Sequence, residues 1–164
     1  MRDLYLHITG PDIKGDSTDN LNKGAIEFDS WQTGNGMAIT GSRSANGNAS
    51  VGRPIFSELV ISKQLDSSSP YLLQNCIKGT TIDQMIIRQY RASKTERVMF
   101  LEITMTECII SSYSMSSPGE GIPSEVFSIN YGKIQYKYTD TDKDTGQAAN
   151  PVIQSYSLIT NEKA

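Results

Sequence analysis

The side chains that most often carry out chemistry in proteins are few in this chain and lie apart. His7 is the only histidine among the 164 residues, so a Ser-His-Asp or Cys-His site would have to use it. It lies in the alternating apolar and polar residues 4–8, which predict a half-buried strand with His7 on its outward face. One histidine also excludes the zinc-protease motif, which needs two.

Three aspartates repeat at the spacing that opens a calcium-binding loop: Asp140, Asp142 and Asp144. That loop needs a glycine at its sixth position, where this chain has Thr145, and a bidentate glutamate at its twelfth, where it has Pro151. A polar hairpin connection over residues 140–151 therefore explains the aspartates better than a metal site does.

The remaining candidates for acid–base or thiol chemistry are also isolated. Glu102 falls on the strand face opposite Met99 and Leu101, where a solvated glutamate belongs. Cys76 and Cys108 have no C-x-x-C spacing and are interpreted as free thiols of a protein made in a reducing compartment. Glycine-rich phosphate-binding motifs do not occur. We expect no enzyme, no cofactor and no metal.

Composition limits the class of protein further. A length of 164 residues, with 37% hydrophobic and 20% charged residues, predicts one folded domain over residues 1–164. The net charge of −3 gives no general attraction to nucleic acid or to anionic lipid. Apolar runs are too short for a membrane-spanning helix or a secretory signal, so we expect no membrane insertion and synthesis in the cytoplasm.

Alternating apolar and polar residues dominate the chain and predict about nine short strands. Clusters of Gly, Pro, Asn and Ser separate them, which is typical of an antiparallel β-sandwich or β-barrel. The expected strands cover residues 4–8, 26–29, 56–62, 82–91, 97–105, 108–115, 126–131, 133–139 and 152–159.

One segment has helical periodicity instead. Ser69 is expected to be the N-cap, Pro70 the first helical residue and Gly79 the C-terminal stop. The apolar residues at helical spacing are Leu72, Leu73, Cys76 and Ile77. Residues 32–54 are expected to form a long loop rich in Gly and Asn, which is uncommon in a compact domain unless the loop is functional.

Four short motifs follow one another along the chain. Residues 15–19 have the sequence G-D-S-T-D, and residues 63–72 fit K-x-x-D-x-x-[ST]-P-x-L. Residues 100–113 hold two strands, the second ending in Ser-Ser-Tyr, and residues 123–134 hold P-x-E followed by F-S-I-N-Y-G-K-I. This ordered set resembles the Hcp family, the haemolysin-coregulated proteins of bacterial type VI secretion systems. The chain departs from the family at Asn22, where members often carry histidine.

The resemblance implies a mainly-β fold: an antiparallel barrel of two packed sheets with one short α-helix and a long extended loop. It also implies homohexameric rings that stack into a hollow inner tube. A contractile sheath would propel the tube, and a spike protein of the VgrG type would cap it. Secreted effector proteins would travel in the lumen, chaperoned by the ring. The protein would be made in the bacterial cytoplasm and secreted without a cleaved signal peptide.

A closed ring needs two different surface patches that meet head to tail. We expect the sheet faces and the helix at residues 69–78 to supply this lateral contact. The long loop is expected to contact the next ring through Gly34, Met37, Ile39, Arg43, Asn46 and Val51. The lumen and its effectors are expected to contact Glu27, Asp29 and Gln32.

Two other classes of function compete with this interpretation. A monomeric, lectin-like β-sandwich that binds a ligand would explain the strands and polar loops, but not the ordered motifs. A small hydrolase would have to use scattered glutamates, namely Glu96, Glu102 and Glu107.

Overall fold

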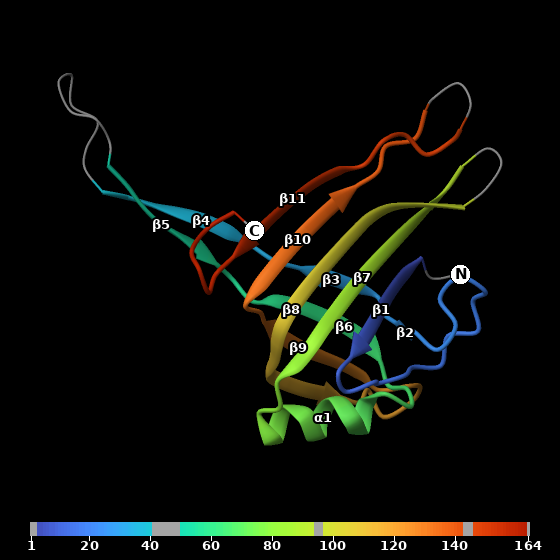
Figure 1. Cartoon of the computed structure of the whole chain (residues 1–164). Helices are drawn as coiled ribbons and strands as arrows, with labels where there is room; N and C mark the ends of the chain where they lie inside the picture. The colour runs from blue at the N-terminus through green and yellow to red at the C-terminus, as the bar shows by residue number, and fades with distance from the viewer. Residues whose placement is uncertain (1–2, 41–49, 94–96, 143–145, 164) are drawn as a thin grey trace.

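The computed structural model describes residues 3–40, 50–93, 97–142 and 146–163, and it confirms a mainly-β protein with one short helix (Figure 1). The elements in chain order are β1 (Leu4–Thr9), β2 (Ile26–Glu27), β3 (Ser30–Gln32), β4 (Asn35–Thr40), β5 (Ser50–Phe56), β6 (Leu59–Gln64), α1 (Ser69–Lys78), β7 (Ile82–Ala92), β8 (Arg97–Ser116), β9 (Ser124–Asn130), β10 (Lys133–Tyr138) and β11 (Val152–Ser157).

Nine of these strands form two antiparallel sheets that share β8. The first sheet has the order β2-β1-β7-β8-β10-β11. The second sheet has the order β8-β9-β6-β3. Strands β4 and β5 pair only with each other among the described residues and form a separate hairpin.

Strand β8 turns the corner between the two sheets. The sequence predicted two strands, over residues 97–105 and 108–115, but the structure has a single strand there. Glu107 adopts a positive φ of 55°, which is uncommon for a residue with a side chain. Up to Cys108, strand β8 pairs with β7, and up to Thr106 it also pairs with β10, whereas from Ile109 onward it pairs with β9. The bend at Glu107 therefore redirects one strand from the first sheet into the second.

The opposite corner is made by residues 26–32. The backbone N–H of Phe28 donates to Leu4 of the first sheet (3.3 Å), and that of Asp29 donates to Ser62 of the second (2.8 Å). No ladder hydrogen bonds join β2 to β3 among the described residues, so the sheet is not closed into a hydrogen-bonded barrel. The bent chain itself links the two sheets, as at the corners of other packed sheets.

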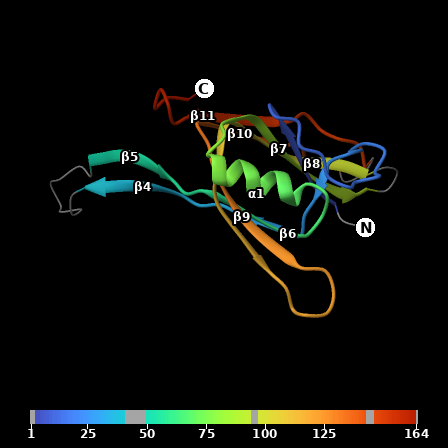
Figure 2. The same cartoon turned by 90° about the horizontal axis from the view of Figure 1, so that it is seen from below.

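The core lies between the two sheets. Alternate residues of each strand point inward, including Leu6 and Ile8 of β1, Ile103 and Met105 of β8, and Phe127 of β9. Helix α1 lies across one end of the sheets (Figure 2), where it contacts β8 and contributes the fully buried Leu72. The period-2 pattern therefore identified the inward faces correctly.

Helix α1 begins at Ser69, one residue earlier than predicted, and its N-cap is Ser68 instead of Ser69. The Ser69 hydroxyl instead accepts the backbone N–H of Asp66 at 3.0 Å and donates to Glu125 at 2.9 Å. Pro70 lies in the first turn, where a missing N–H leaves no bond unmade. Gly79 ends the helix in the left-handed conformation, with φ 61°, which confirms the predicted stop.

A buried ion pair holds the start of α1 against the second sheet. The Lys63 Nζ lies 2.6 Å from Glu125 Oε1 and 2.8 Å from Asp66 Oδ1, and it also donates to the backbone carbonyl of Gln64 at 2.8 Å. The side chains of Lys63 and Glu125 have no solvent exposure. Tyr113 donates its hydroxyl to the second oxygen of Glu125. Both buried charges are therefore supplied with several partners, as stable burial of a charge requires.

A loop over residues 10–25, here called the strap, covers part of the outer face of the first sheet. Arg97 fastens it: its guanidinium lies 2.8 Å from Asp19 Oδ2 and stacks over the Tyr90 ring at 4.5 Å. Burial raises the pKa of Asp19, but hydrogen bonds from Asn22 and Arg97 outweigh this effect and lower it.

Asn22 is a buried residue of the strap, and it joins the strap to the sheet beneath. Its Oδ1 lies 3.0 Å from His7 Nε2 and 3.2 Å from the Tyr90 hydroxyl. His7 points away from the core as predicted, but the strap half-buries it. Burial lowers the pKa of His7, the Asn22 hydrogen bond opposes this, and Arg88 lowers the pKa further.

Replacement of Lys63 by methionine should lower the free energy of unfolding by about 3–5 kcal/mol, because Glu125 would remain buried without its cation. Urea unfolding followed by circular dichroism measures this. Lys14→Met is the matched control, since Lys14 is exposed and pairs with the exposed Asp12, and it should change stability by less than about 1 kcal/mol. A Lys63→Met variant as stable as Lys14→Met would contradict the assigned role of the pair.

Stability should fall as the pH drops through the ordinary histidine pKa of 6.5. The pKa of His7 is lower in the folded protein than in the unfolded chain. At a pH between these two pKa values the unfolded chain binds more protons, which stabilises it relative to the folded protein. Thermal unfolding between about pH 8 and about pH 5 measures this effect. His7→Gln should show a shallower dependence, since this chain has no other histidine. Identical pH profiles for the two proteins would exclude His7 as the cause.

Candidate functional site

The segment predicted as a long loop is a projecting hairpin. Strands β4 and β5 pair in antiparallel register and extend away from the two sheets (Figures 1 and 2). The register shifts between Met37 and Ile39, and the extra residue lies on β5. Gly52 lies so close to the opposite strand that a Cβ there would be 2.8 Å from the Ala38 carbonyl oxygen. The glycine at position 52 therefore reflects close strand pairing, although glycine is also typical of loops.

One face of this hairpin is apolar and uncovered in the described structure. Met37 and Ile39 share that face, and their side chains are 48% and 61% exposed. Ile55 lies on the opposite face, because it pairs with Gly36, and it is 58% exposed. A two-stranded hairpin is marginally stable by itself in water. The exposed apolar side chains therefore mark the hairpin as a contact surface.

Three tyrosines fasten the base of the hairpin to the sheets, one of them, Tyr136, through a side-chain hydrogen bond with Asn35. Tyr156 of β11 stacks on Phe56 with ring centroids 4.9 Å apart. Tyr131 donates its hydroxyl to the Ser57 carbonyl at 3.0 Å. Burial raises the pKa of Tyr131 and of Tyr136, so both hydroxyls stay protonated near neutral pH. Neutral hydroxyls can donate hydrogen bonds here, so the base is held more firmly than an isolated hairpin would be.

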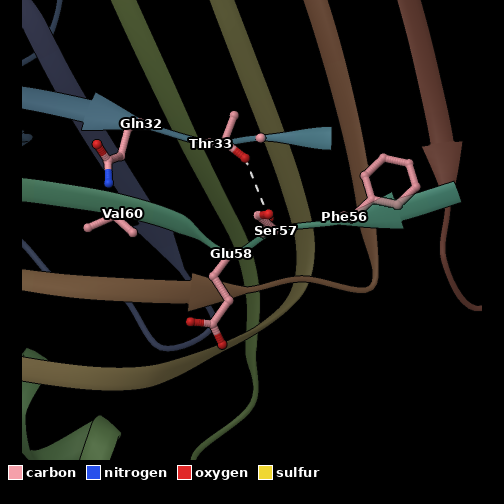
Figure 3. A pocket seen from close by; sticks show the side chains of 7 residues that line it. Gln32, Thr33, Phe56, Ser57, Glu58 and Val60 are labelled. Atoms are coloured by element: carbon pink, nitrogen blue, oxygen red, sulfur yellow. Dashed lines mark hydrogen bonds between the residues drawn. The ribbon is translucent and has the colours of Figure 1, made fainter. Parts of the chain in front are cut away.

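A hollow of about 650 Å³ lies at this base (Figure 3). Thr33 and Ser57 close one side through a hydrogen bond of 3.5 Å. The lining residues are Gln32, Thr33, Gly34, Phe56, Ser57, Glu58 and Val60. The hollow therefore joins the hairpin to the outer face of the second sheet.

The predicted stacking residues fall on three parts of this feature. Gly34 lines the hollow, and Met37 and Ile39 form the apolar face. Val51 pairs with Ile39 across the hairpin. Arg43 and Asn46 lie outside the described residues. The structure thus brings together the four predicted positions that it describes.

The predicted lumen residues are divided between the sheets. Glu27 lies in β2 and pairs with Tyr5 of the first sheet, whereas Gln32 lies in β3 and pairs with Val60 of the second. Asp29 lies at the corner between them and is exposed. One sheet face therefore does not hold all three.

Helix α1 has a second apolar face, which points to solvent. Leu72 is buried and Cys76 is half-buried, but Leu73 and Ile77 lie on the outside and Ile77 is 76% exposed. Tyr71, which the sequence prediction missed, is 57% exposed beside them. The sequence held the information needed to predict this exposure, since Tyr71 and Ile77 lie at the two edges of one side of the predicted helix.

The chemical candidates do not assemble into a reactive site among the described residues. No group of three His, Cys, Asp or Glu side chains there can hold a metal ion. Glu102 was expected to be solvated, which is wrong: it is largely buried, with Arg88 at 3.0 Å and Lys137 at 3.9 Å. Burial raises the pKa of the Cys108 thiol to about 12, so this thiol is unreactive near neutral pH.

Within the described part of the chain, no helix combines the length and the apolar character needed to cross a membrane.

Comparison with known proteins agrees with this geometry. A profile of the family described as "Type VI secretion system effector, Hcp" matches residues 5–138. Protein hcp1 of Pseudomonas aeruginosa is 28% identical over 108 residues, which are 65% of this chain and 67% of that protein.

Solved structures share the fold along the whole chain. A type six secretion system protein has a TM-score of 0.89 at 24% identity, with 100% of both chains covered. Hcp1 from Salmonella typhimurium has a TM-score of 0.75 at 21% identity, with 99% of this chain and 98% of that chain covered. With the family profile matching most of its length, this chain belongs to the Hcp family of type VI secretion proteins.

Proposed function

We propose that this chain is the repeating subunit of a type VI secretion tube, in which rings of six copies stack and are secreted. The observation that carries the proposal is the presence of two separate uncovered apolar surfaces, one on the hairpin and one on α1. A ring that closes and then stacks needs different patches for different contacts. The hairpin projects from the body and suits contact with the next ring, while α1 suits contact within a ring.

The same proposal assigns the remaining partners. The tube would be capped by a spike protein of the VgrG type, surrounded by a contractile sheath and loaded with small effector proteins. It would assemble in the bacterial cytoplasm before secretion without signal cleavage. Its action is mechanical and non-enzymatic.

The solution mass of the purified protein, measured by light scattering after size exclusion, should be near six times the 18.1 kDa chain. Ile77→Glu should shift the mass toward that of the monomer, because a charge would be buried in the lateral contact. Leu21→Glu is the control, since Leu21 is 62% exposed on the strap and outside the proposed contact.

A wild-type protein that stays monomeric at high concentration would overturn the ring proposal and favour a ligand-binding β-sandwich. Equal behaviour of the Ile77→Glu and Leu21→Glu variants would instead remove α1 from the contact and leave the ring in place.

Ile39→Glu should leave rings intact but shorten or abolish stacked tubes, because the charge lies on the apolar hairpin face proposed to meet the next ring. Electron microscopy of negatively stained samples measures tube length, and light scattering checks the ring. Ile55→Glu places the same charge at similar exposure on the opposite hairpin face and should change tube length much less. Tubes of wild-type length in the Ile39→Glu variant would contradict the stacking role.

A further inference from the structure

The hairpin that projects from the sheets (Figure 1) carries one side chain that mild oxidants convert, Met37. It is the only sulfur-containing residue between positions 35 and 56, and its side chain is 48% exposed. Oxidation of a methionine to the sulfoxide turns a flexible apolar side chain into a polar one. A single oxygen atom at this position therefore changes the character of a contact surface.

The hairpin face that holds Met37 is covered near its base and uncovered farther out. Two residues earlier on the same strand, Asn35 hydrogen-bonds Tyr136, and its cross-strand partner Phe56 stacks on Tyr156. Side chains two residues apart on a strand share a face, so Met37 continues the face that packs on these tyrosines. Cover by the first sheet thus decreases between Asn35 and Met37, and the methionine is left accessible.

The other methionines that the structure describes differ in their accessibility. Met85 and Met105 lie in the core with no exposure, and Met99 is partly buried. Met115 is 54% exposed, close to the value for Met37. It lies near the end of β8, where it pairs with Glu125 of the second sheet, and so it does not belong to the hairpin. Met115 is therefore an internal reference for oxidation away from the hairpin.

From this arrangement we infer that Met37 is an oxidation site, and that its sulfoxide blocks the stacking of rings. The inference rests on the proposed function, in which the apolar hairpin face contacts the next ring. In the reaction one oxygen atom passes from hydrogen peroxide to the sulfur of Met37, and the rest of the peroxide leaves as water. The sulfur loses two electrons, which the oxygen–oxygen bond takes up as it breaks.

The sulfoxide opposes stacking because of its polarity. Its oxygen accepts hydrogen bonds from water in a free ring and loses them when the next ring covers the hairpin. Burial of a polar group without a partner costs free energy, and in a ring of six copies this cost arises at six hairpins. Oxidation should therefore raise the protein concentration at which tubes form by about tenfold or more.

Stacking also protects the residue on which it depends. A hairpin covered by the next ring no longer exposes Met37 to solvent, so peroxide reaches this residue in free rings and at an open end of a tube. Rings inside a tube keep the thioether. Methionine sulfoxide reductases convert the sulfoxide back, so the block on free rings is reversible. Oxidation thus distinguishes rings that have not yet stacked from rings in a finished tube.

The test treats purified rings with graded doses of hydrogen peroxide. Peptide mass spectrometry measures the sulfoxide at each methionine, and electron microscopy measures tube length. Met37 and Met115 should convert about tenfold or more faster than Met85 and Met105, because oxidation follows exposure. Tubes should be lost as Met37 converts, while light scattering still finds whole rings. The two methionine sulfoxide reductases, one for each epimer, should restore tube length.

Variants assign the effect to one residue. Met37→Leu has a similar volume but no sulfur, so the length of its tubes, whatever its value before treatment, should not change with peroxide. Met37→Gln places a permanent amide on the same face and should shorten tubes without peroxide. Met115→Leu and Met115→Gln are the matched controls. The first should leave tubes sensitive to peroxide, and the second should leave untreated tubes at wild-type length.

Three results would overturn the inference. Equal loss of Met37→Leu and wild-type tubes in peroxide would place the sensitive group elsewhere. Full conversion of Met37 with unchanged tube formation would separate the residue from stacking. Conversion of Met37 in free rings as slow as that of Met85 would remove the accessible site. Wild-type rings that form no tubes before any treatment are a distinct outcome, which refutes the stacking role in the proposed function.

Discussion

Lys63 and Glu125 face each other across β6 and β9 with no exposure to water, and much of the second sheet depends on that pairing. A one-residue slip of either strand would turn its inward side chains outward and leave a buried charge without its partner. Because Lys63 and Glu125 point inward, their neighbours Ser62 and Val126 must point outward. The buried pair thus fixes the register of the core and, through it, which side chains lie on the outer face of the second sheet.

The same pair also fixes the helix. Ser69 donates to Glu125 from the first residue of α1, and Asp66 contacts Lys63 just before it. Asp16 of the strap accepts the backbone N–H of Ser67 at 3.2 Å and its hydroxyl at 2.5 Å. Strap, helix start and second sheet therefore meet at one polar junction, and this junction sets the direction in which α1 presents Tyr71 and Ile77.

Local patterns in the sequence were enough to predict most strands, the helix limits and the mainly-β class, because period-2 and helical spacing are short-range properties. Local patterns were not enough where a residue's environment depends on a contact with a residue far away in the sequence. Lys63 and Glu125 each stood in a recognised motif, but their contact needs the register of two strands. Glu102 was placed in solvent because Arg88 and Lys137 join it only across strands. The β4–β5 hairpin was missed because close strand approach at Gly52 uses residues that are also typical of loops.

These constraints give the molecule surfaces of different character that cannot substitute for one another. The hairpin and α1 expose side chains that gain free energy when covered, so contacts there are suited to persist. The first sheet pairs its charges within its own row and lies partly beneath the strap. The outer face of the second sheet exposes the hydroxyl groups of Ser30, Ser112 and Ser114, which gain little free energy when they leave water. The bend of β8 at Glu107 produces this separation, because it carries one strand from the first sheet into the second and so gives the two outer faces different side chains.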